Sequence, residues 1–378
     1  MKNDVICSLW LHTRKGISNH IKKALIDEYK TASTLYYMNT AEIDGIYADT
    51  SVKQALLNKN TDEACAVKRA CDEKSIEIIA YEDDSYPKLL RDISSPPYIL
   101  YKKGADIDLK NMKAAAVVGS RILSDYGKYV TAKISDDLCA QGFTIVSGMA
   151  AGADGEAHRA ARNAGAPTVA VLGCGADIVY PMQNRDIYEY ASKYGAVISE
   201  YPPSFSPTRS SFPARNRIIA GISAFTVVTE ARLNSGSLIT ARDANSYGRR
   251  VFAVPQNINS PYGQGSNQLL KEYAHVITSG ADAFEYYIRE YGGREQAEQI
   301  RRNIRKRAEE TIKEQNFSED EKRIIKALKN GASHINKISD ETGFPIGKAK
   351  ALMSLLEIRG VVCSIAGNAY GLTEGLIK

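Results

Sequence analysis

The chain contains no long apolar run and no closely paired cysteines. No segment approaches the roughly 18 apolar residues that a membrane-spanning helix needs, and the first residues lead into no apolar core of the signal-peptide kind. We therefore expect a cytoplasmic protein that does not contact membranes. The cysteines form no C-x-x-C pair and have no histidines at metal-ligand spacing, so we expect reduced, mostly packed thiols and no bound metal. They are Cys7, Cys65, Cys71, Cys139, Cys174 and Cys363.

A strong charge of either sign is also missing. The 49 Lys and Arg residues and 44 Asp and Glu residues leave a net charge of +5, which by itself does not indicate a nucleic-acid partner. Residues 201–250, however, contain seven Arg, no Lys and two acids, which is a local net charge of +5. The remainder of the chain is neutral overall. The whole surplus is therefore a local arginine patch of the kind that holds a polyphosphate.

Length and composition predict a globular protein of several domains. A chain of 378 residues predicts two to three domains, and its 44% apolar and 25% charged residues exclude disordered, collagen-like and coiled-coil classes. Residues 1–105 are expected to form a small helical domain, with helices near 17–29 and 61–71. Pro96-Pro97 cannot lie inside a helix and marks the boundary region, which is followed by an expected strand over 98–101.

The central part, residues 106–288, alternates short apolar runs with longer amphipathic segments. The runs lack polar alternation, as expected of parallel strands that are buried on both faces under helices. This pattern predicts an α/β domain with a doubly wound, Rossmann-like parallel sheet. The expected strands lie at 114–118, 143–147, 168–172, 196–198, 225–228 and 251–254.

Two further segments follow. Residues 289–317 lose the apolar runs and gain charge, which indicates an exposed helical linker, although its basic cluster over 301–307 is also compatible with a nucleic-acid contact. Residues 318–378 begin with a capping box, Ser318 and Glu321, and continue as three expected helices and a hairpin, the pattern of a winged helix. Its third helix is only modestly basic, so we expect a protein contact or a spacer role rather than duplex reading.

The expected strands end in short polar loops, and ligands of an open parallel sheet gather at the carboxyl ends of its strands. In the first loop, Gly119 allows close backbone approach, Ser120 opens toward a helix N-terminus, and Arg121 can fork onto a phosphate. In the second loop, Gly148 lets the main chain present its amides. Asp154 and His158 follow it at a spacing that suits either a cap with helix packing, which we favour, or an acid-base pair.

The third and fourth loops fall within the arginine-rich window. The third carries Arg209, Arg215 and Arg217 together with Asn216, and its Phe212 either stacks on a base or packs under the loop. The fourth opens a helix with Ser-Gly-Ser, which is a second anion-binding helix start at the same sheet edge. The predicted nucleic-acid-binding residues are Gly119, Ser120, Arg121, Gly148, Arg209, Phe212, Arg215, Asn216, Arg217, Ser235, Gly236, Ser237 and Thr240.

Two common phosphate-binding motifs are absent from these loops. The chain contains no G-x-x-x-x-G-K-[ST], and its first central strand leads into no G-x-G-x-x-G with an acidic residue at the expected offset. We therefore expect no nucleotide cofactor. An alternative is a nucleotide-hydrolysing enzyme of a related Rossmann superfamily, with Glu230 or Asp154 as the general base, but no P-G-G-x-G-T-x-x-E type site is present.

The central domain closely resembles the bacterial DNA-processing family called DprA or Smf. The resemblance extends over nearly the whole domain in order, and it continues into the text around Tyr86-Pro87 and Pro96-Pro97 and into the winged-helix tail. The chain departs from the family pattern at Gln256 and Tyr273, where the family often has glycine. The matching segments are 119–121, 147–158, 173–181, 212–221 and 235–241.

The resemblance implies a non-catalytic protein that binds single-stranded DNA. It implies that the protein protects incoming single strands and loads the recombinase RecA onto them in natural transformation and recombination. It further implies a homodimer formed largely through the Rossmann-like domain. By matching position, the DNA pocket would be lined by Arg121, Arg209, Phe212, Arg215, Asn216 and Arg217.

Overall fold

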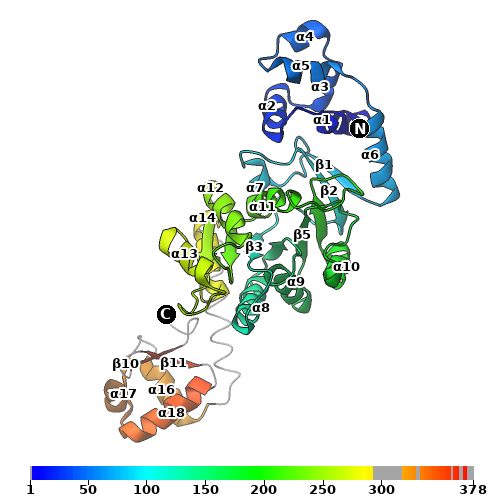
Figure 1. Cartoon of the computed structure of the whole chain (residues 1–378). Coiled ribbons are helices and arrows are strands. Elements are labelled where there is room, and N and C mark those ends of the chain that lie inside the picture. Colours follow the sequence, from blue (N-terminus) through cyan, green and yellow to red (C-terminus); the bar gives the residue numbers. More distant parts are fainter. Residues whose placement is uncertain (1, 293–316, 329–332, 359–360, 366–368, 373–378) are drawn as a thin grey trace. The chain divides into compact units, whose positions relative to one another are not determined.

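The structure is a computed structural model in which two compact units are distinguished, Met1–Tyr287 and Ile288–Lys378. It describes residues 2–292, 317–328, 333–358, 361–365 and 369–372 (Figure 1). Within those residues, none of the helices combines the length and the apolar character that crossing a membrane requires. The predicted linker over 289–317 lies mostly outside the described residues.

The first unit begins with six helices that pack around Trp10 and other fully buried apolar side chains. Polar side chains start several of them: Ser18 accepts a hydrogen bond from the Ile21 amide at the start of α2, and Asn39 forms a capping box with Glu42 in α4. The predicted helices near 17–29 and 61–71 are thereby confirmed as α2 and α6. The bounds are α1 Lys2–Thr13, α2 Asn19–Tyr29, α3 Ala32–Tyr37, α4 Thr40–Asp44, α5 Thr50–Leu57 and α6 Asp62–Glu73.

A sheet of nine strands forms the centre of this unit. Its order is β1-β2-β6-β5-β4-β3-β7-β8-β9, and the part from β6 to β9 is parallel. The six apolar runs expected as strands are all confirmed, and the sheet is the predicted doubly wound parallel one. The bounds are β1 Glu77–Ala80, β2 Ile99–Gly104, β3 Ala114–Val118, β4 Thr144–Ser147, β5 Thr168–Leu172, β6 Ala196–Ser199, β7 Phe225–Val228, β8 Arg250–Ala253 and β9 His275–Val276.

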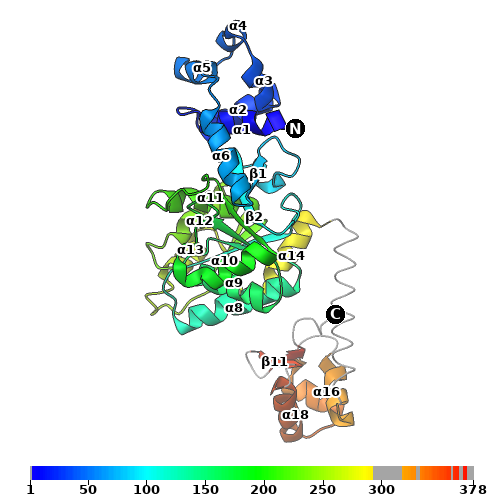
Figure 2. The ribbon, with the colours of Figure 1, turned by 90° about the vertical axis from the view of Figure 1, so that its right-hand side faces the viewer.

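Helices cover both faces of the parallel part. Helices α8, α9 and α10 lie on one face, and α11 and α12 lie on the other, as the two views in Figures 1 and 2 show. The chain changes face between β6 and β7, because β7 pairs with β3 rather than with β6. The bounds are α7 Lys88–Arg91, α8 Asp125–Ala140, α9 Ala153–Asn163, η1 Met182–Asn184, α10 Arg185–Tyr194, α11 Ser211–Ile222, α12 Ser237–Ser246, α13 Gln264–Glu272 and α14 Gly280–Tyr291.

The strands β1 and β2 extend the same sheet, although the sequence analysis assigned residues 77–104 to the helical domain. They pair antiparallel with each other, and β2 pairs antiparallel with β6. Residues Ile99 to Tyr101 are fully buried. An apolar strand of this kind closes the otherwise open edge of β6, and this pairing joins the helical part to the sheet.

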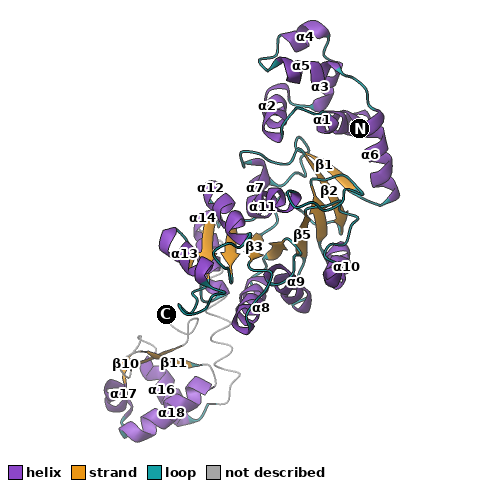
Figure 3. Ribbon diagram, in the orientation of Figure 1, coloured by secondary structure: helices purple, strands orange, loops and turns teal. Residues whose placement is uncertain are grey.

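From residue 317 onward, the described residues of the second unit form three helices and a small antiparallel sheet, as predicted for a winged helix (Figure 3). The capping box is present: the Ser318 amide donates to Glu321 Oε2 at 2.8 Å, and the Glu321 amide donates to Ser318 Oγ at 3.3 Å. Gly343 ends the second helix with φ of 69°. The predicted turn at 366–368 lies outside the described residues. The bounds are α16 Glu319–Leu328, β10 Ser333–His334, α17 Ile335–Thr342, α18 Ile346–Ile358, β11 Val362–Ile365 and β12 Ala369–Leu372.

Candidate nucleic-acid interface

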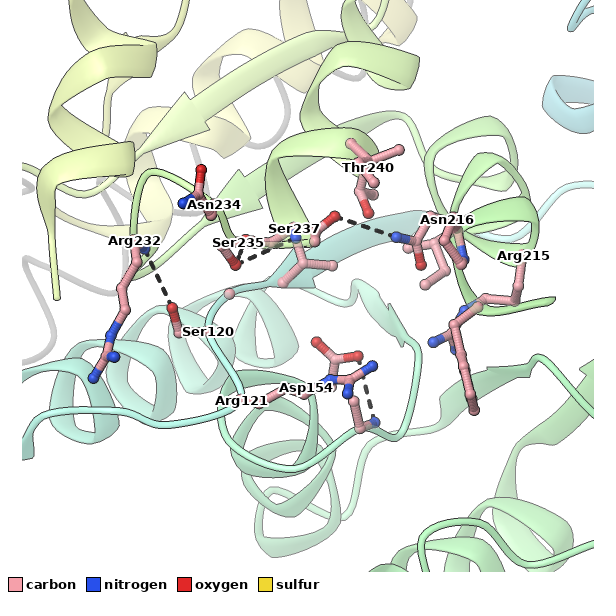
Figure 4. A pocket seen from close by; sticks show the side chains of 18 of the residues that line it. Ser120, Arg121, Asp154, Arg215, Asn216, Arg232, Asn234, Ser235, Ser237 and Thr240 are labelled. Carbon is pink, nitrogen blue, oxygen red and sulfur yellow. Dashed lines mark hydrogen bonds between the residues drawn. The ribbon is translucent and has the colours of Figure 1, made fainter. Parts of the chain in front are cut away.

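A pocket of about 730 Å³ opens at the carboxyl edge of the parallel sheet. It lies where β3 and β7 are neighbours and the chain connections run in opposite directions, which is the usual ligand position in a doubly wound sheet. Figure 4 shows the polar side chains that surround it. Its lining residues come from the loops after β3, β4, β5, β6 and β7, which are far apart in the sequence.

The loop after β3 is held in place by its backbone. Gly119 needs to be glycine, because a Cβ there would lie 2.6 Å from the Cβ of Ala153 and 2.8 Å from the Glu230 carbonyl oxygen. The Ser120 amide donates to that same carbonyl at 2.7 Å. Arg121 follows directly, and its side chain is exposed and lines the pocket. The close packing of the loop therefore fixes the backbone position from which the Arg121 side chain extends.

The loop between β6 and α11 supplies an aromatic surface. Phe212 stacks on Tyr180 with a ring-centroid distance of 5.4 Å, and Tyr180 remains 44% exposed. The Arg121 guanidinium carbon lies 5.8 Å from the Phe212 ring centroid. Arg209 is exposed at the same loop and lines the pocket. Two cations and two rings thus meet at this side of the pocket, which is a combination suited to phosphates and bases.

The loop between β7 and α12 supplies hydroxyl and amide groups. Ser235 Oγ and Ser237 Oγ lie 2.8 Å apart, and the Asn216 side-chain amide donates to the Gly236 carbonyl at 3.3 Å. Thr240 lies one turn further along α12 and also lines the pocket. Ser237 and Thr240 belong to the first turn of this ten-residue helix, and Ser235 and Gly236 directly precede it, at the end where the helix dipole favours an anion.

A buried charge pair lies under the pocket. Arg215 is 4% exposed, and its guanidinium donates to the Gly148 carbonyl at 2.7 Å and to the Val171 carbonyl. The Asp154 carboxylate accepts from the Gly148 amide at 3.1 Å and from the Ala150 amide at 3.4 Å. Burial raises the pKa of Asp154, while the charge of Arg215 and these hydrogen bonds act against that rise. The two opposite charges compensate each other beneath the pocket.

His158 forms no acid-base pair with Asp154. Its Nδ1 lies 2.6 Å from Thr168 Oγ1, and the ring is fully buried. Burial, with a smaller contribution from the charge of Arg215, lowers the pKa of His158 to about 3, so the ring is neutral at neutral pH. The structure therefore supports packing rather than acid-base chemistry for His158. The expected cap at Asp154 is wrong, because Gly152 is the N-cap of α9 and the Asp154 carboxylate instead binds amides of the preceding loop.

The pocket brings together eleven of the thirteen predicted binding residues, and it excludes two. Arg217 does not line it: its guanidinium is paired with the Glu200 carboxylate at 2.5 Å and donates to the Ser95 carbonyl at 3.1 Å. Two residues correspond to about 200° of helix rotation, so Arg215 and Arg217 cannot point the same way. Gly148 is also outside the lining, because the Arg215 guanidinium covers it. Neither residue therefore lines this pocket.

Several pocket residues were not predicted. Tyr180, Asn234 and Arg232 line the pocket, as do Ile122 and Ile239. Arg232 belongs to the arginine-rich window, and Tyr180 belongs to a segment that resembles the family, so both signals were present in the sequence. Sequence alone does not show that a residue after β5 reaches the ring of Phe212. Within the described residues, no carboxylate forms an ion pair with Arg121, Arg209 or Arg232.

The residues of the described part offer little for catalysis or metal binding at this edge. Glu230 is fully buried and outside the pocket lining, and its carboxylate accepts hydrogen bonds from the Ser124 amide at 2.8 Å and from Ser124 Oγ at 2.5 Å. It therefore supports the start of α8. No group of three or more His, Cys, Asp and Glu side chains gathers at metal-binding distance among the residues described.

Comparisons with known proteins agree with this architecture. Residues 77–288 match the family model described as DNA recombination-mediator protein A, and residues 308–368 match the DprA winged helix domain. The chain belongs to the DprA family. The first match begins at Glu77, which is the first residue of β1, so the DprA domain includes the two antiparallel strands. The resemblance inferred from the loop residues is confirmed, and so is the fold class.

Individual DprA relatives match over much of their length. The protein Smf of Synechocystis is 35% identical over 79% of this chain and 80% of its own, and the DNA processing protein DprA of Streptococcus pneumoniae is 42% identical over 53% and 70%. Among solved structures, the S. pneumoniae DprA has a TM-score of 0.64 and 32% identity, covering 74% of this chain and 96% of that one.

The DprA of Helicobacter pylori gives a second structural match. It has a TM-score of 0.52 and 30% identity, and the match covers 58% of this chain and 99% of that one. That structure concerns the binding mode of the H. pylori protein for single-stranded DNA.

Proposed function

We propose that the pocket binds single-stranded DNA of any base sequence. The observation that carries this proposal is the pair of exposed arginines in the pocket lining, Arg121 and Arg209, which form no ion pair with any residue that the structure describes. Arg121 lies beside Phe212, which stacks on Tyr180. Arginines contact the phosphate backbone of any strand, and a ring stacks on any base. The paired bases of a duplex do not offer their faces to such a ring, so the combination favours single strands.

The DprA relatives support this proposal. The H. pylori protein, whose fold matches, binds single-stranded DNA. In this chain, polar groups of the loops after β3 and β7 line the pocket, together with the exposed Arg121 and Arg209. No observation favours the alternative of nucleotide hydrolysis, because Glu230 is engaged with Ser124.

The experiment is a fluorescence-anisotropy titration of labelled oligothymidylate at several salt concentrations. The change Arg121→Ala should weaken binding to every sequence and reduce the slope of log K against log salt by about 0.7, as expected for one lost phosphate contact on a single strand. The matched control is Arg185→Ala, an exposed arginine on α10 that pairs with Glu189, and it should leave both quantities unchanged. Unaltered affinity and slope in Arg121→Ala would refute the pocket.

We further propose that the protein acts in the cytoplasm as a non-catalytic mediator that protects incoming single strands and loads RecA onto them in transformation or recombination. The proposal includes a homodimer through the Rossmann-like domain. It rests on membership of the DprA family and on the binding pocket. A RecA-loading assay on protein-coated single strands should show loading with the wild type and little with Arg121→Ala. Hydrolysis of nucleoside monophosphates that is lost in Glu230→Gln would contradict the non-catalytic role.

A further inference from the structure

Arg232 reaches the pocket from the loop after β7, whereas the rings of Tyr180 and Phe212 come from the loop after β5 and from the start of α11. It follows β7, its side chain is exposed, and it lines the pocket. Figure 4 shows it well separated from Arg215 and Asn216, with Ser120 and Arg121 between them. Its backbone amide donates to Ser120 Oγ at 3.3 Å, so the loops after β3 and β7 are joined here.

The guanidinium of Arg232 is oriented by Tyr262. Its central carbon lies 4.4 Å from the centroid of the Tyr262 ring. A guanidinium that lies over a ring gains a cation–π attraction and keeps the N–H groups at its edge available for hydrogen bonds. No carboxylate of the described residues pairs with it. Because the ring already orients the Arg232 side chain, this side chain loses little conformational entropy when its guanidinium binds an anion.

The position of Tyr262 is fixed by the segment that follows it. The Gly265 amide donates to the Ala231 carbonyl at 2.7 Å, and the Ala231 amide donates to Ser266 Oγ at 2.9 Å. A Cβ at Gly265 would lie 2.5 Å from the Arg232 carbonyl oxygen, so glycine permits this close approach. The start of α13 is therefore attached to the loop that carries Arg232, and Tyr262 lies beside it.

The loop after β8 is attached to the same edge. Gln256, which stands where the family often has glycine, donates its side-chain amide to the Thr229 carbonyl at 2.8 Å, and its own amide donates to Asn267 Oδ1 at 3.0 Å. Further along this loop, Ile258 is 86% exposed. The segment 256–262 is thus attached next to the loop that carries Arg232, and its Tyr262 contacts the Arg232 guanidinium.

We propose that Arg232, positioned by Tyr262, binds a backbone phosphate where the single strand leaves the pocket. The inference rests on the proposed function and assigns to the pocket a second subsite on the β7–β8 side. One strand then contacts the rings of Tyr180 and Phe212 at one side and Arg232 at the other, and it continues over the loop after β8. Short oligonucleotides that occupy the aromatic side do not reach Arg232, whereas longer ones do.

The test is an anisotropy titration with oligothymidylates from about 3 to about 16 nucleotides, a range that spans typical single-strand site sizes. The change Arg232→Ala should leave the affinity for the shortest bound oligonucleotides unchanged. It should lower the affinity for the longest about tenfold at low salt and reduce the magnitude of their salt slope by about 0.7. In contrast, Arg121→Ala should weaken binding at every length.

The role of Tyr262 is tested by two substitutions. The ring and not the hydroxyl of Tyr262 orients the guanidinium. Tyr262→Leu should therefore show part of the length-dependent loss of affinity that is expected for Arg232→Ala, whereas Tyr262→Phe should keep the wild-type affinity. The matched control is Tyr194→Leu, which removes an exposed tyrosine that also contacts a cation, Lys193, at 4.9 Å. That pair lies at the end of α10, next to the amino end of β6, and the substitution should change nothing.

Three outcomes would decide against these proposals. An equal loss at all lengths in Arg232→Ala would overturn the second subsite, because it would make Arg232 part of the central contact. No loss at any length would overturn it as well. If the wild type bound no oligothymidylate of any length, the proposed function itself would fail, and the subsite with it.

Discussion

At the residue scale, Phe212 is the ring that we propose stacks on a base in the pocket. It is half-buried, it stacks on Tyr180, and the Arg121 guanidinium lies near its face. The packing interpretation of this residue is therefore confirmed in part, and stacking on a base stays a prediction. One part of the ring packs against its neighbours, and the rest borders the pocket. A base that stacks here would meet an aromatic surface whose orientation is already fixed.

The change Phe212→Ala should lower the affinity for single strands between about 5-fold and about 100-fold, because one base–aromatic stack contributes about 1–3 kcal/mol. Anisotropy titrations with oligothymidylate and with a mixed-sequence strand measure this. Both strands should lose affinity alike. Tyr47→Ala, which removes a fully exposed ring on the helical part, serves as the control. A loss confined to one sequence would contradict sequence-independent stacking.

His158 makes the stability of the protein depend on pH. Burial lowers its pKa from 6.5 to about 3. The unfolded chain therefore binds a proton on this ring below pH 6.5, whereas the folded protein does not until the pH approaches 3. This contribution to stability is present above pH 6.5 and is lost as the pH falls toward 3, by about 1.4 kcal/mol per pH unit.

The variant His158→Gln should be less stable than the wild type at pH 7 and should show a shallower loss of stability between pH 6.5 and pH 5. Urea unfolding at several pH values measures the free energy of unfolding in both proteins. The difference between the two slopes should be about 1.4 kcal/mol per pH unit. Identical slopes would show that His158 becomes protonated in the folded protein.

At the scale of elements, three consecutive polar residues of α11 have different partners. Arg215 points into the core under the pocket, Asn216 contacts the start of α12, and Arg217 is paired with Glu200. A helix turns about 100° per residue, so these three side chains point in different directions. The sequence shows an arginine-rich segment, but the helix decides which of the arginines reaches the pocket.

The change Arg217→Ala should therefore reduce stability and leave the intrinsic affinity for single strands nearly unchanged. Removal of one partner leaves the Glu200 carboxylate, whose side chain is only 12% exposed, without its cation. We expect a loss of about 2–4 kcal/mol in the free energy of unfolding. A double-mutant cycle with Glu200→Gln measures the coupling. A large loss of affinity without a loss of stability would show that Arg217 takes part in binding single strands.

At the scale of the whole molecule, the site belongs to the first unit. The lining of the pocket runs from Val118 to Thr240, and all of it lies within Met1–Tyr287. The second unit, Ile288–Lys378, has a hydrophobic core of its own around Ile324, Ile338 and Met353. The two units therefore have separate cores, and binding does not need the winged helix to build the pocket.

Deletion of residues 318–378 should leave affinity for single strands within about threefold of the wild type, since every pocket residue is retained. An anisotropy titration of the truncated and full chains with the same oligothymidylate measures this. Melting curves of both proteins provide the control for folding of the first unit. Loss of most of the affinity would mean that the winged helix carries the main binding surface.

The sequence by itself determined the elements, the fold class and the family. Apolar runs without polar alternation have to be buried on both faces, so β3 to β8 were predictable, and so was the capping box of α16. The position of the polar loops was predictable as well, because the carboxyl ends of parallel strands lie at the same edge of a sheet. Most of the residues that line the pocket from these loops were therefore predictable, since their positions depend on local chain geometry.

Only the tertiary structure decided which side chains face the ligand. It directed Arg217 to Glu200, placed Arg215 over Gly148, and brought Tyr180 onto Phe212 and Tyr262 onto Arg232. It also paired β2 with β6, which turned part of the presumed helical domain into the sheet. Each of these outcomes depends on a partner that is distant in the sequence. Local pattern carries no information about such a partner until the chain has folded.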